Sequence, residues 1–263
     1  LLQLGGTRKR LSIFFSDLIS FTSFAEKLPP ETVVNLLNEY LDAMTKVIFS
    51  KQGTLDKFEG DAIMAFFGAP LDQADHAKKA CEAAVEMRQV LSQLHEKWHR
   101  EGKPLLDFCV GIATGDVVVG NLGSKERFDY TVIGDTVNLC SRMESINRLY
   151  GTKILVDEAT MQSSKDLFMF RKIDRVRVKG KAQATTIYEL VMQKNLAGAN
   201  IKFLHDFELG MQLYEKYEFE EAKQYFEAAL NEMPKDFVTQ MYIKRCDFLI
   251  KNPPVEKSGL IID

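Results

Sequence analysis

The sequence predicts an α+β fold, in which helices cover an antiparallel sheet, followed by a small all-α appendage. Three observations predict it. The apolar run Leu11–Phe15 leads to a carboxylate at Asp17, two pairs of strand-like runs flank turns that contain glycine, and the segments between them repeat apolar residues with helical spacing. We expect the order strand, two helices, hairpin, helix, hairpin, helix and then strands.

The length and composition limit the class of protein to which the chain can belong. Its 263 residues are 46% hydrophobic and 27% charged, enough for one full domain and an appendage. The net charge of −3 provides no basic field for nucleic acid or an anionic membrane. No apolar stretch approaches the roughly 20 residues of a membrane-spanning helix. The four cysteines are scattered, without metal-binding spacing, and indicate buried, reduced thiols in a cytoplasmic protein.

The elements can be assigned in order. Residues 1–10 are interpreted as an N-terminal linker. Because the chain begins at Leu1 rather than Met, we expect a fragment, and any sensor would lie before Leu1. The run from Leu11 predicts a buried strand that delivers Asp17 at its end. Residues 22–49 predict a short and a long helix, which Pro29-Pro30 separates.

Two hairpins are predicted, with a long helix between them. Residues 54–68 predict two strands joined at Glu59-Gly60, with Asp61 at the turn. Residues 75–100 predict an Ala-rich helix with surface histidines at 76, 95 and 99 and a packing role for Trp98. Residues 105–113 and 117–122 predict the second hairpin, through Thr114-Gly115-Asp116, in which we interpret Asp116 as a turn residue and not a metal ligand.

The rest of the chain alternates short elements. Residues 129–144 predict a strand, a glycine turn and a helix. Short strands are expected at residues 154–156, 169–173, 176–178 and 185–191. Residues 196–200 form a plausible linker to a helical segment, residues 201–252, and a tail, residues 253–263.

Asp17 and Asp61 are candidate metal ligands. Each alone is most simply a turn residue at the end of a strand. Together, on neighbouring strands, they offer the shared ligands that two hard cations about 4 Å apart need for phosphate chemistry. The spacing by itself leaves both interpretations open.

Four motifs decide between them. They are FFSDLISFT (residues 14–22), DKFEGDAIMAFFG (56–68), GIATGDVVVGNLG (111–123) and DYTVIGDTVNLCSRME (129–144). In this order they closely resemble the catalytic domain of the class III nucleotidyl cyclases, the adenylate and guanylate cyclases. The resemblance runs from about Lys9 to Val191 and implies a ferredoxin-like antiparallel sheet with helices, with a catalytic domain at residues 11–195.

The resemblance also implies a division of roles. Asp17, the backbone carbonyl of Leu18 and Asp61 would bind two divalent cations, Mg²⁺ or Mn²⁺. Asn138 and Arg142, which share one helix face at i, i+4, match the pair that orients the ribose and stabilises the transition state. Lys179 matches a lysine that reaches the triphosphate, and Arg127 is a weaker phosphate candidate.

Base recognition falls to Lys57 and Thr131. Guanylate cyclases carry Glu where this chain has Lys57. The usual partner of the lysine is Asp, and Thr131 is a departure known among bacterial and bicarbonate-responsive cyclases. A lysine only donates hydrogen bonds, so it suits the N1 acceptor of adenine and not the N1–H of guanine. ATP is therefore the expected substrate.

The family's sites lie between two chains. Asp17 and Asp61 would come from one chain, whereas Lys57, Thr131, Asn138, Arg142 and Lys179 would come from the other. Since this chain carries both sets, we expect a homodimer with two equivalent sites and an isologous interface.

Residues 201–252 resemble one tetratricopeptide-like helical repeat. One repeat cannot bury its own apolar face, so it must pack on the catalytic domain or on a second chain, or belong to a longer array. A generic helical hairpin is the alternative. Protein contacts through this segment are a further expectation.

The expected function is that of an adenylate cyclase, which makes 3′,5′-cyclic AMP and pyrophosphate from ATP. A guanylate cyclase is opposed by Lys57 and Thr131. A diguanylate cyclase would need a Gly-Gly-Asp/Glu-Glu-Phe turn, which residues 59–63 lack. A catalytically silent dimerisation module remains the non-enzymatic alternative, although no expected catalytic position is lost.

Overall fold

The computed structural model describes residues 4–176, 184–194 and 201–253. Contacts divide the chain into two compact units. The first comprises residues 1–147 and 153–164, and the second comprises residues 148–152 and 165–263. The last two strands therefore group with the C-terminal helices, although the sequence suggested a boundary near residues 196–200.

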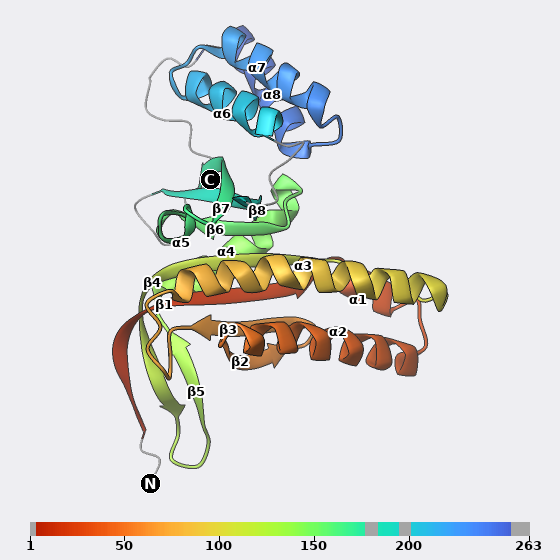
Figure 1. Ribbon diagram of the computed structural model, residues 1–263, viewed down its shortest axis with the longest axis vertical. Helices are drawn as coiled ribbons and strands as arrows, with labels where there is room; N and C mark the ends of the chain where they lie inside the picture. The colour runs from red at the N-terminus through yellow and green to blue at the C-terminus, as the bar shows by residue number, and fades with distance from the viewer. Residues whose placement is uncertain (1–3, 177–183, 195–200, 254–263) are drawn as a thin grey trace. The chain divides into compact units, whose positions relative to one another are not determined.

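The first unit is a sheet with associated helices (Figure 1). Its elements are β1 (Gly5–Leu18), α1 (Phe21–Ala25), α2 (Pro30–Ser50), β2 (Thr54–Glu59), β3 (Ala62–Phe67), α3 (His76–Arg100), β4 (Phe108–Gly123), β5 (Phe128–Ile133), α4 (Asp135–Tyr150, its end in the second unit), β6 (Ile154–Asp157) and α5 (Glu158–Ser164). The strand order is β2-β3-β1-β4-β6, and β5 pairs with β4 outside this path. The α+β fold is confirmed.

The two faces of β4 carry different helices. Gly111 faces α4 so closely that a Cβ there would lie 2.6 Å from the backbone nitrogen of Glu144. Thr114 lies three residues on, and therefore on the opposite face of the strand. Its hydroxyl bonds to Ser12 of β1 at 2.7 Å, and Ser12 bonds to Nδ1 of His76, the first residue of α3, at 2.8 Å. Helix α4 thus covers one face, and α3 covers the other with α2 beside it.

The predicted hairpin through residues 114–116 is wrong. Residues 108–123 form the single strand β4, in which Gly115 opposes Leu11 of β1. A Cβ on Gly115 would lie 2.5 Å from Oγ1 of Thr136, so this glycine serves the close approach of α4 and not a turn. The second hairpin instead joins β4 to β5, and the amide of Ser124 donates to the carbonyl of Arg127 at 2.8 Å in its turn.

Two further expectations need correction. Residues 5–10 are not a linker, because they extend β1 and pair with residues 116–121 of β4, although most of their side chains are exposed. The sheet is also mixed rather than antiparallel, because β6 runs parallel to β4. Helix α4 supplies the crossover connection that a parallel pair requires.

The long helix α3 confirms one prediction and corrects another. Trp98 is fully buried, and its indole N–H donates to Oε2 of Glu39 at 3.1 Å. His76 and His95 are half-buried and hydrogen-bonded, not surface residues, and Nε2 of His95 lies 2.6 Å from the carbonyl oxygen of Leu106. All four cysteines are buried and free, as expected.

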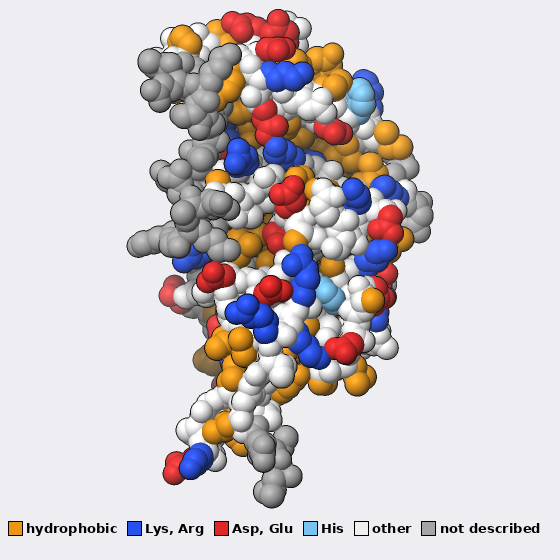
Figure 2. Space-filling view, turned by 90° about the vertical axis from the view of Figure 1, so that its left-hand side faces the viewer, with side chains coloured by type: hydrophobic (Ala, Val, Ile, Leu, Met, Phe, Trp, Pro, Cys, Tyr) orange, Lys and Arg blue, Asp and Glu red, His pale blue; other side chains and the backbone are white. Residues whose placement is uncertain are grey.

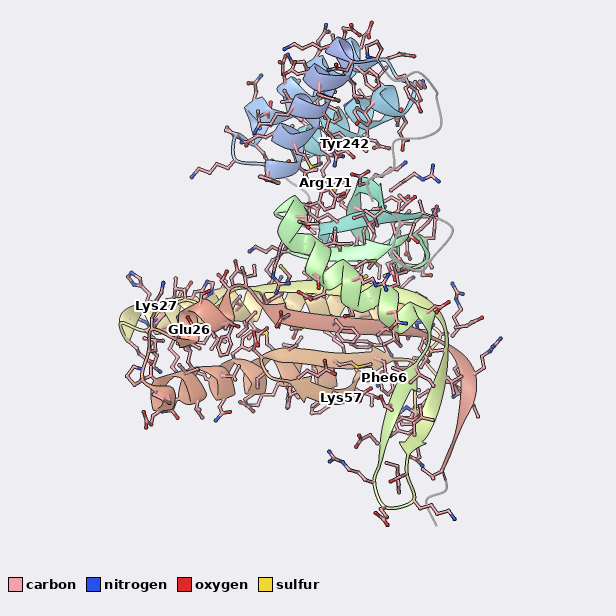
Figure 3. All side chains as sticks on the ribbon, turned by 180° about the vertical axis from the view of Figure 1, so that it is seen from behind. Glu26, Lys27, Lys57, Phe66, Arg171 and Tyr242 are labelled. Carbon is pink, nitrogen blue, oxygen red and sulfur yellow. The ribbon has the colours of Figure 1, made fainter. Side chains whose placement is uncertain are left out.

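The second unit joins a β-hairpin to three helices. Its elements are β7 (Phe168–Val176), β8 (Thr185–Gln193), α6 (Ile201–Glu215), α7 (Phe219–Glu232) and α8 (Phe237–Lys251). Strand β7 is continuous where two strands were predicted, of which residues 177 and 178 lie outside the described residues. Tyr242 of α8 donates its hydroxyl hydrogen to the carbonyl of Ile173 at 2.6 Å, beside Arg171 (Figure 3). The C-terminal helices therefore pack on β7.

The surface carries mixed charge. On the face shown in Figure 2, acidic and basic side chains are interspersed. Within the described residues, no helix combines the length and the apolar content needed to cross a bilayer.

Candidate active site

Asp17 and Asp61 meet at the end of β1. This strand ends at Leu18, and β3 pairs antiparallel beside it. The turn between β2 and β3, where Gly60 has a φ of +67°, places Asp61 against Asp17. Burial, and then the neighbouring charge of Asp17, raise the pKa of Asp61 to about 6.

This pair is suited to cations. Two carboxylates held this close repel each other unless a proton or a cation lies between them. The backbone amide of Leu18 donates to Asp61 and so fixes the second carboxylate at the strand end. Among the described residues, no group of three or more acidic, His or Cys side chains could hold a metal. Two carboxylates nevertheless fit Mg²⁺, which is usually bound by one or two of them together with water and substrate phosphates.

A second cluster joins β2 to β5. Thr131 donates its hydroxyl hydrogen to Oδ2 of Asp56, and Nζ of Lys57 lies 3.3 Å from Oδ1 of the same carboxylate. The Asp56 side chain is fully buried, whereas that of Lys57 is 37% exposed. Figure 3 labels Lys57 and Phe66. Close by, the rings of Phe66 and Tyr130 pack with centroids 6.0 Å apart, which holds β5 against β3. The structure thus brings Lys57 and Thr131 to one carboxylate.

Asn138 and Arg142 lie on the accessible side of α4. The helix starts after Gly134, whose φ of +152° favours glycine. Asn138 is exposed and Arg142 is partly exposed. On the opposite side, the buried thiol of Cys140 donates to the carbonyls of Ile13 and Gly111, each at 3.1 Å. Asn138 and Arg142 therefore lie on the outer side of a helix that is fixed to the sheet.

Residues 6–191 match the family model described as "Adenylate and Guanylate cyclase catalytic domain". The match covers more than half of the chain and includes each site residue predicted from the sequence. The chain belongs to this family.

Curated relatives of this cyclase domain include three adenylate cyclases. Adenylate cyclase 1 of Rhizobium meliloti is 38% identical over 184 residues, 70% of this chain and 28% of that protein. The adenylate cyclase of Anabaena cylindrica is 38% identical over 189 residues, 69% of this chain and 37% of that protein. The terminal-differentiation specific adenylate cyclase of Dictyostelium discoideum is 37% identical over 257 residues, 96% of this chain and 12% of that protein. The chain thus spans a minor part of each, and the last match extends into the C-terminal helices.

Two solved structures resemble the cyclase domain to a similar degree. The adenylyl cyclase CyaB from P. aeruginosa has a TM-score of 0.68 at 39% identity, covering 74% of this chain and 100% of that one. The guanylyl cyclase Cya2 has a TM-score of 0.66 at 36% identity, covering 74% of this chain and 98% of that one. Overall structural likeness therefore does not distinguish an adenylate cyclase from a guanylate cyclase for this chain.

Three residues complete the comparison of the cyclase site with its prediction. Arg127 is exposed in the tight turn between β4 and β5. Lys179 lies outside the described residues. Asp56 was not singled out from the sequence, although one signal was present, since Asp56 and Lys57 are consecutive charged residues in a strand where polar and apolar residues should alternate.

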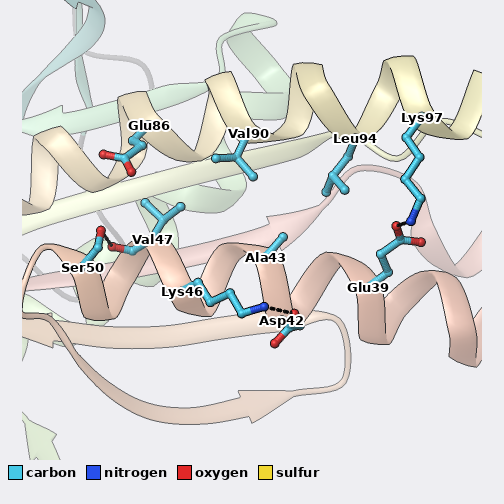
Figure 4. A pocket seen from close by; sticks show the side chains of 10 residues that line it. All are labelled: Glu39, Asp42, Ala43, Lys46, Val47, Ser50, Glu86, Val90, Leu94 and Lys97. Atoms are coloured by element: carbon cyan, nitrogen blue, oxygen red, sulfur yellow. Dashed lines mark hydrogen bonds and ion pairs between the residues drawn. The ribbon is translucent and has the colours of Figure 1, made fainter.

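A groove of about 620 Å³ runs between α2 and α3 (Figure 4). Val47, Val90 and Leu94 line it, and the ion pair of Lys97 with Glu39 bridges the two helices. No described residue predicted for the active site lines this groove, so it is separate from the cyclase site.

Proposed function

We propose that this chain is the catalytic domain of an adenylate cyclase, which converts ATP to 3′,5′-cyclic AMP and pyrophosphate. The observation that carries the proposal is the cluster of Lys57, Thr131 and Asp56. An ammonium group donates only, and it matches N1 of adenine but opposes the N1–H of guanine. The Thr131 hydroxyl can accept a hydrogen bond from the 6-amino group of adenine.

The remaining residues supply the phosphate chemistry. Asp17, Asp61 and the carbonyl of Leu18 would hold two divalent cations, Mg²⁺ or Mn²⁺, which when bound serve the attacking 3′-oxygen and the leaving pyrophosphate. Asn138 orients the ribose by hydrogen bonding. Arg142 donates to the charge that develops on the oxygens of the α-phosphate.

Two basic residues extend the proposed site. Lys179 and Arg127 are assigned to the other phosphates of the substrate from their places in the sequence. A lysine or arginine there would hold the pyrophosphate in line with the attacking oxygen, which is the orientation that in-line displacement requires.

Activity requires a homodimer under this proposal. One chain contributes Asp17 and Asp61, and the other contributes the base-binding residues and the two α4 residues. Because each chain carries both groups, an isologous pair forms two equivalent sites. In the C-terminal helices, a Cβ on Gly210 of α6 would lie 2.7 Å from the Phe226 ring of α7. This close helix contact supports a tetratricopeptide-like repeat, and we assign protein contacts to this segment from that resemblance alone.

The competing function is that of a guanylate cyclase, which the likeness to Cya2 favours. The deciding experiment incubates the purified chain with ATP or GTP, together with Mg²⁺ or Mn²⁺, and identifies the cyclic product by mass spectrometry. We expect cyclic AMP, with an ATP-to-GTP ratio of kcat/KM well above one. A preference for GTP would assign guanylate cyclase activity, and no product from either nucleotide would indicate a silent module.

A further inference from the structure

We propose that Asp56 determines the base specificity of this site as a positioning residue, because it makes Thr131 an obligate hydrogen-bond acceptor and holds Lys57 toward the purine. The inference rests on the proposed cyclase function and adds a residue to it. Asp56 itself is buried behind Lys57 and Thr131 and acts through them.

Because Asp56 is buried, its carboxylate depends on neighbouring donors and cations to offset the cost of its burial. Its side chain has no exposed surface, and a buried carboxylate is costly unless cations or donors surround it. Oδ2 accepts from the hydroxyl of Thr131. Oδ1 is buried and accepts no hydrogen bond from the described residues, and the Lys57 ammonium lies 3.3 Å away from it. Thr131 is therefore bonded to one oxygen of the carboxylate, and Lys57 forms an ion pair with the other.

A β-bulge makes this arrangement possible. In a regular strand, successive side chains point to opposite faces, so Asp56 and Lys57 would be separated by the sheet. The pairing register of β2 with β3 shifts between Leu55 and Lys57, which makes Asp56 the extra residue. Two consecutive side chains can then join one cluster.

The hydrogen bond from Thr131 to Asp56 determines whether the hydroxyl can donate a hydrogen bond to a base or only accept one. A hydroxyl has one donor and two acceptor lone pairs. Since its hydrogen is directed to Asp56, only the lone pairs face the base. They match the 6-amino donor of adenine and repel the O6 acceptor of guanine. Without Asp56 the hydroxyl could rotate and serve either base.

Asp56 acts on Lys57 in a similar way. The lysine side chain is a flexible four-carbon stem with three donors. The ion pair with Asp56, at 3.3 Å, restrains this stem by charge attraction, and a donor of the ammonium group can then meet N1 of adenine. Asp56 thus gives a neutral threonine the acceptor character of the carboxylate that commonly stands at this position in related adenylate cyclases.

The first test is Asp56→Asn, which keeps the shape but adds an amide that can donate to Thr131. We expect the ATP-to-GTP ratio of kcat/KM to fall about tenfold, mainly through the KM for ATP. Asp157→Asn is the matched control, because Asp157 is also buried and accepts from the backbone of Thr114 and Thr160. The control should leave the ratio unchanged even if it lowers stability.

A second pair of variants tests the route through Thr131. Adding Thr131→Asp to the Asp56→Asn chain returns a carboxylate to the cluster, and the ratio should recover to within about threefold of wild type. In a Thr131→Val background, Asp56→Asn should change the ratio much less than in wild type. Equal effects in both backgrounds would overturn the role assigned to Asp56.

The outcomes separate the two proposals. A wild-type chain that prefers GTP, or makes no cyclic nucleotide, contradicts the proposed function. An ATP-selective wild type whose ratio is unchanged in Asp56→Asn contradicts the role of Asp56 alone. If Asp56→Asn fails to fold, Asp56→Glu tests the inference instead, because the longer side chain keeps the charge but moves the carboxylate out of its place beside Thr131. The ratio should fall in this variant, and an unchanged ratio would contradict the role of Asp56.

Discussion

Arg171 and Asp236 form a bidentate ion pair in which both nitrogen-to-oxygen distances are 2.8 Å. The same guanidinium pairs with Glu189 at 2.6 Å and lies over the rings of Phe203 and Phe207. Burial by itself would raise the pKa of Asp236, but the hydrogen bonds and charge of Arg171 outweigh it, and the pKa is lowered. One buried cation thus connects β7, β8, α6 and the start of α8.

Asp236→Ala should destabilise the C-terminal helices by about 3 kcal/mol, because it leaves the guanidinium buried without its partner. It also removes the N-cap that accepts from the Thr239 amide at 2.8 Å. Hydrogen exchange of amides in α6–α8 measures the effect. Lys202→Ala breaks an exposed ion pair with Glu232 and should leave that exchange unchanged. Equal protection in the two variants would contradict a stabilising role for the buried pair.

Asp17→Asn and Asp61→Asn should each abolish cyclase activity, because under the proposed function each removes a carboxylate that the two cations would share. Neither should unfold the domain. Since burial and Asp17 raise the pKa of Asp61, the ionised pair is unfavourable at neutral pH, and Asp61→Asn should be at least as stable as wild type without metal. Asp116→Asn, on the exposed part of β4, is the control that should keep full activity. Substantial Mg²⁺-dependent turnover in either site variant would refute the metal assignment.

Asp17→Asn chains mixed with Arg142→Ala chains should regain activity, although each variant alone is inactive. In a mixed dimer, one site has both substitutions and the other has neither. At equal concentrations about half of the dimers are mixed, so roughly a quarter of all sites are intact. The measurement is cyclic AMP formation after subunit exchange. No recovery, once exchange is shown by native mass spectrometry, would mean that both residues serve the site from one chain.

Gly111→Ala should cost about 1 to 3 kcal/mol and lower activity, because the new Cβ would meet the backbone of α4 at Glu144. A displaced α4 would carry Asn138 and Arg142 away from their positions. Gly115→Ala is the matched comparison, since its Cβ would meet the side-chain hydroxyl of Thr136, which can rotate. Chemical denaturation and kcat measure the two effects. A Gly115→Ala chain as impaired as Gly111→Ala would argue against the backbone contact as the cause.

The sequence was sufficient to predict the position of a site residue or helix where the local residue pattern and the family motif agreed. Asp61 could be predicted at its turn because Glu59-Gly60 interrupts two apolar strands, and α4 because Gly134 precedes a periodic helix. Gly115 could not be interpreted correctly, since a glycine needed for a turn and one needed for close packing look alike in a sequence. Which one it is depends on α4, more than 20 residues away.

The remaining features could not be predicted from the sequence, because they depend on contacts between residues that are far apart in the chain. Asp56 enters the site through a bulge, and a bulge becomes visible only when the register between β2 and β3 is known. The helices pack on β7 through Arg171 and Asp236, which are 65 residues apart in the chain. The sequence therefore indicated that the helices needed a surface, and the structure identified β7 as that surface.

The buried cysteines make the chain convenient to label. Burial raises the pKa of Cys81 and of Cys246 to about 12, and that of Cys140 well above its usual range. Because a thiol reacts with maleimides as the thiolate, these side chains are poor targets at neutral pH while the chain is folded. A single cysteine placed at the exposed Glu126 would take up a fluorophore selectively. Energy transfer between donor-labelled and acceptor-labelled chains would then follow their association in real time, with every native cysteine left in place.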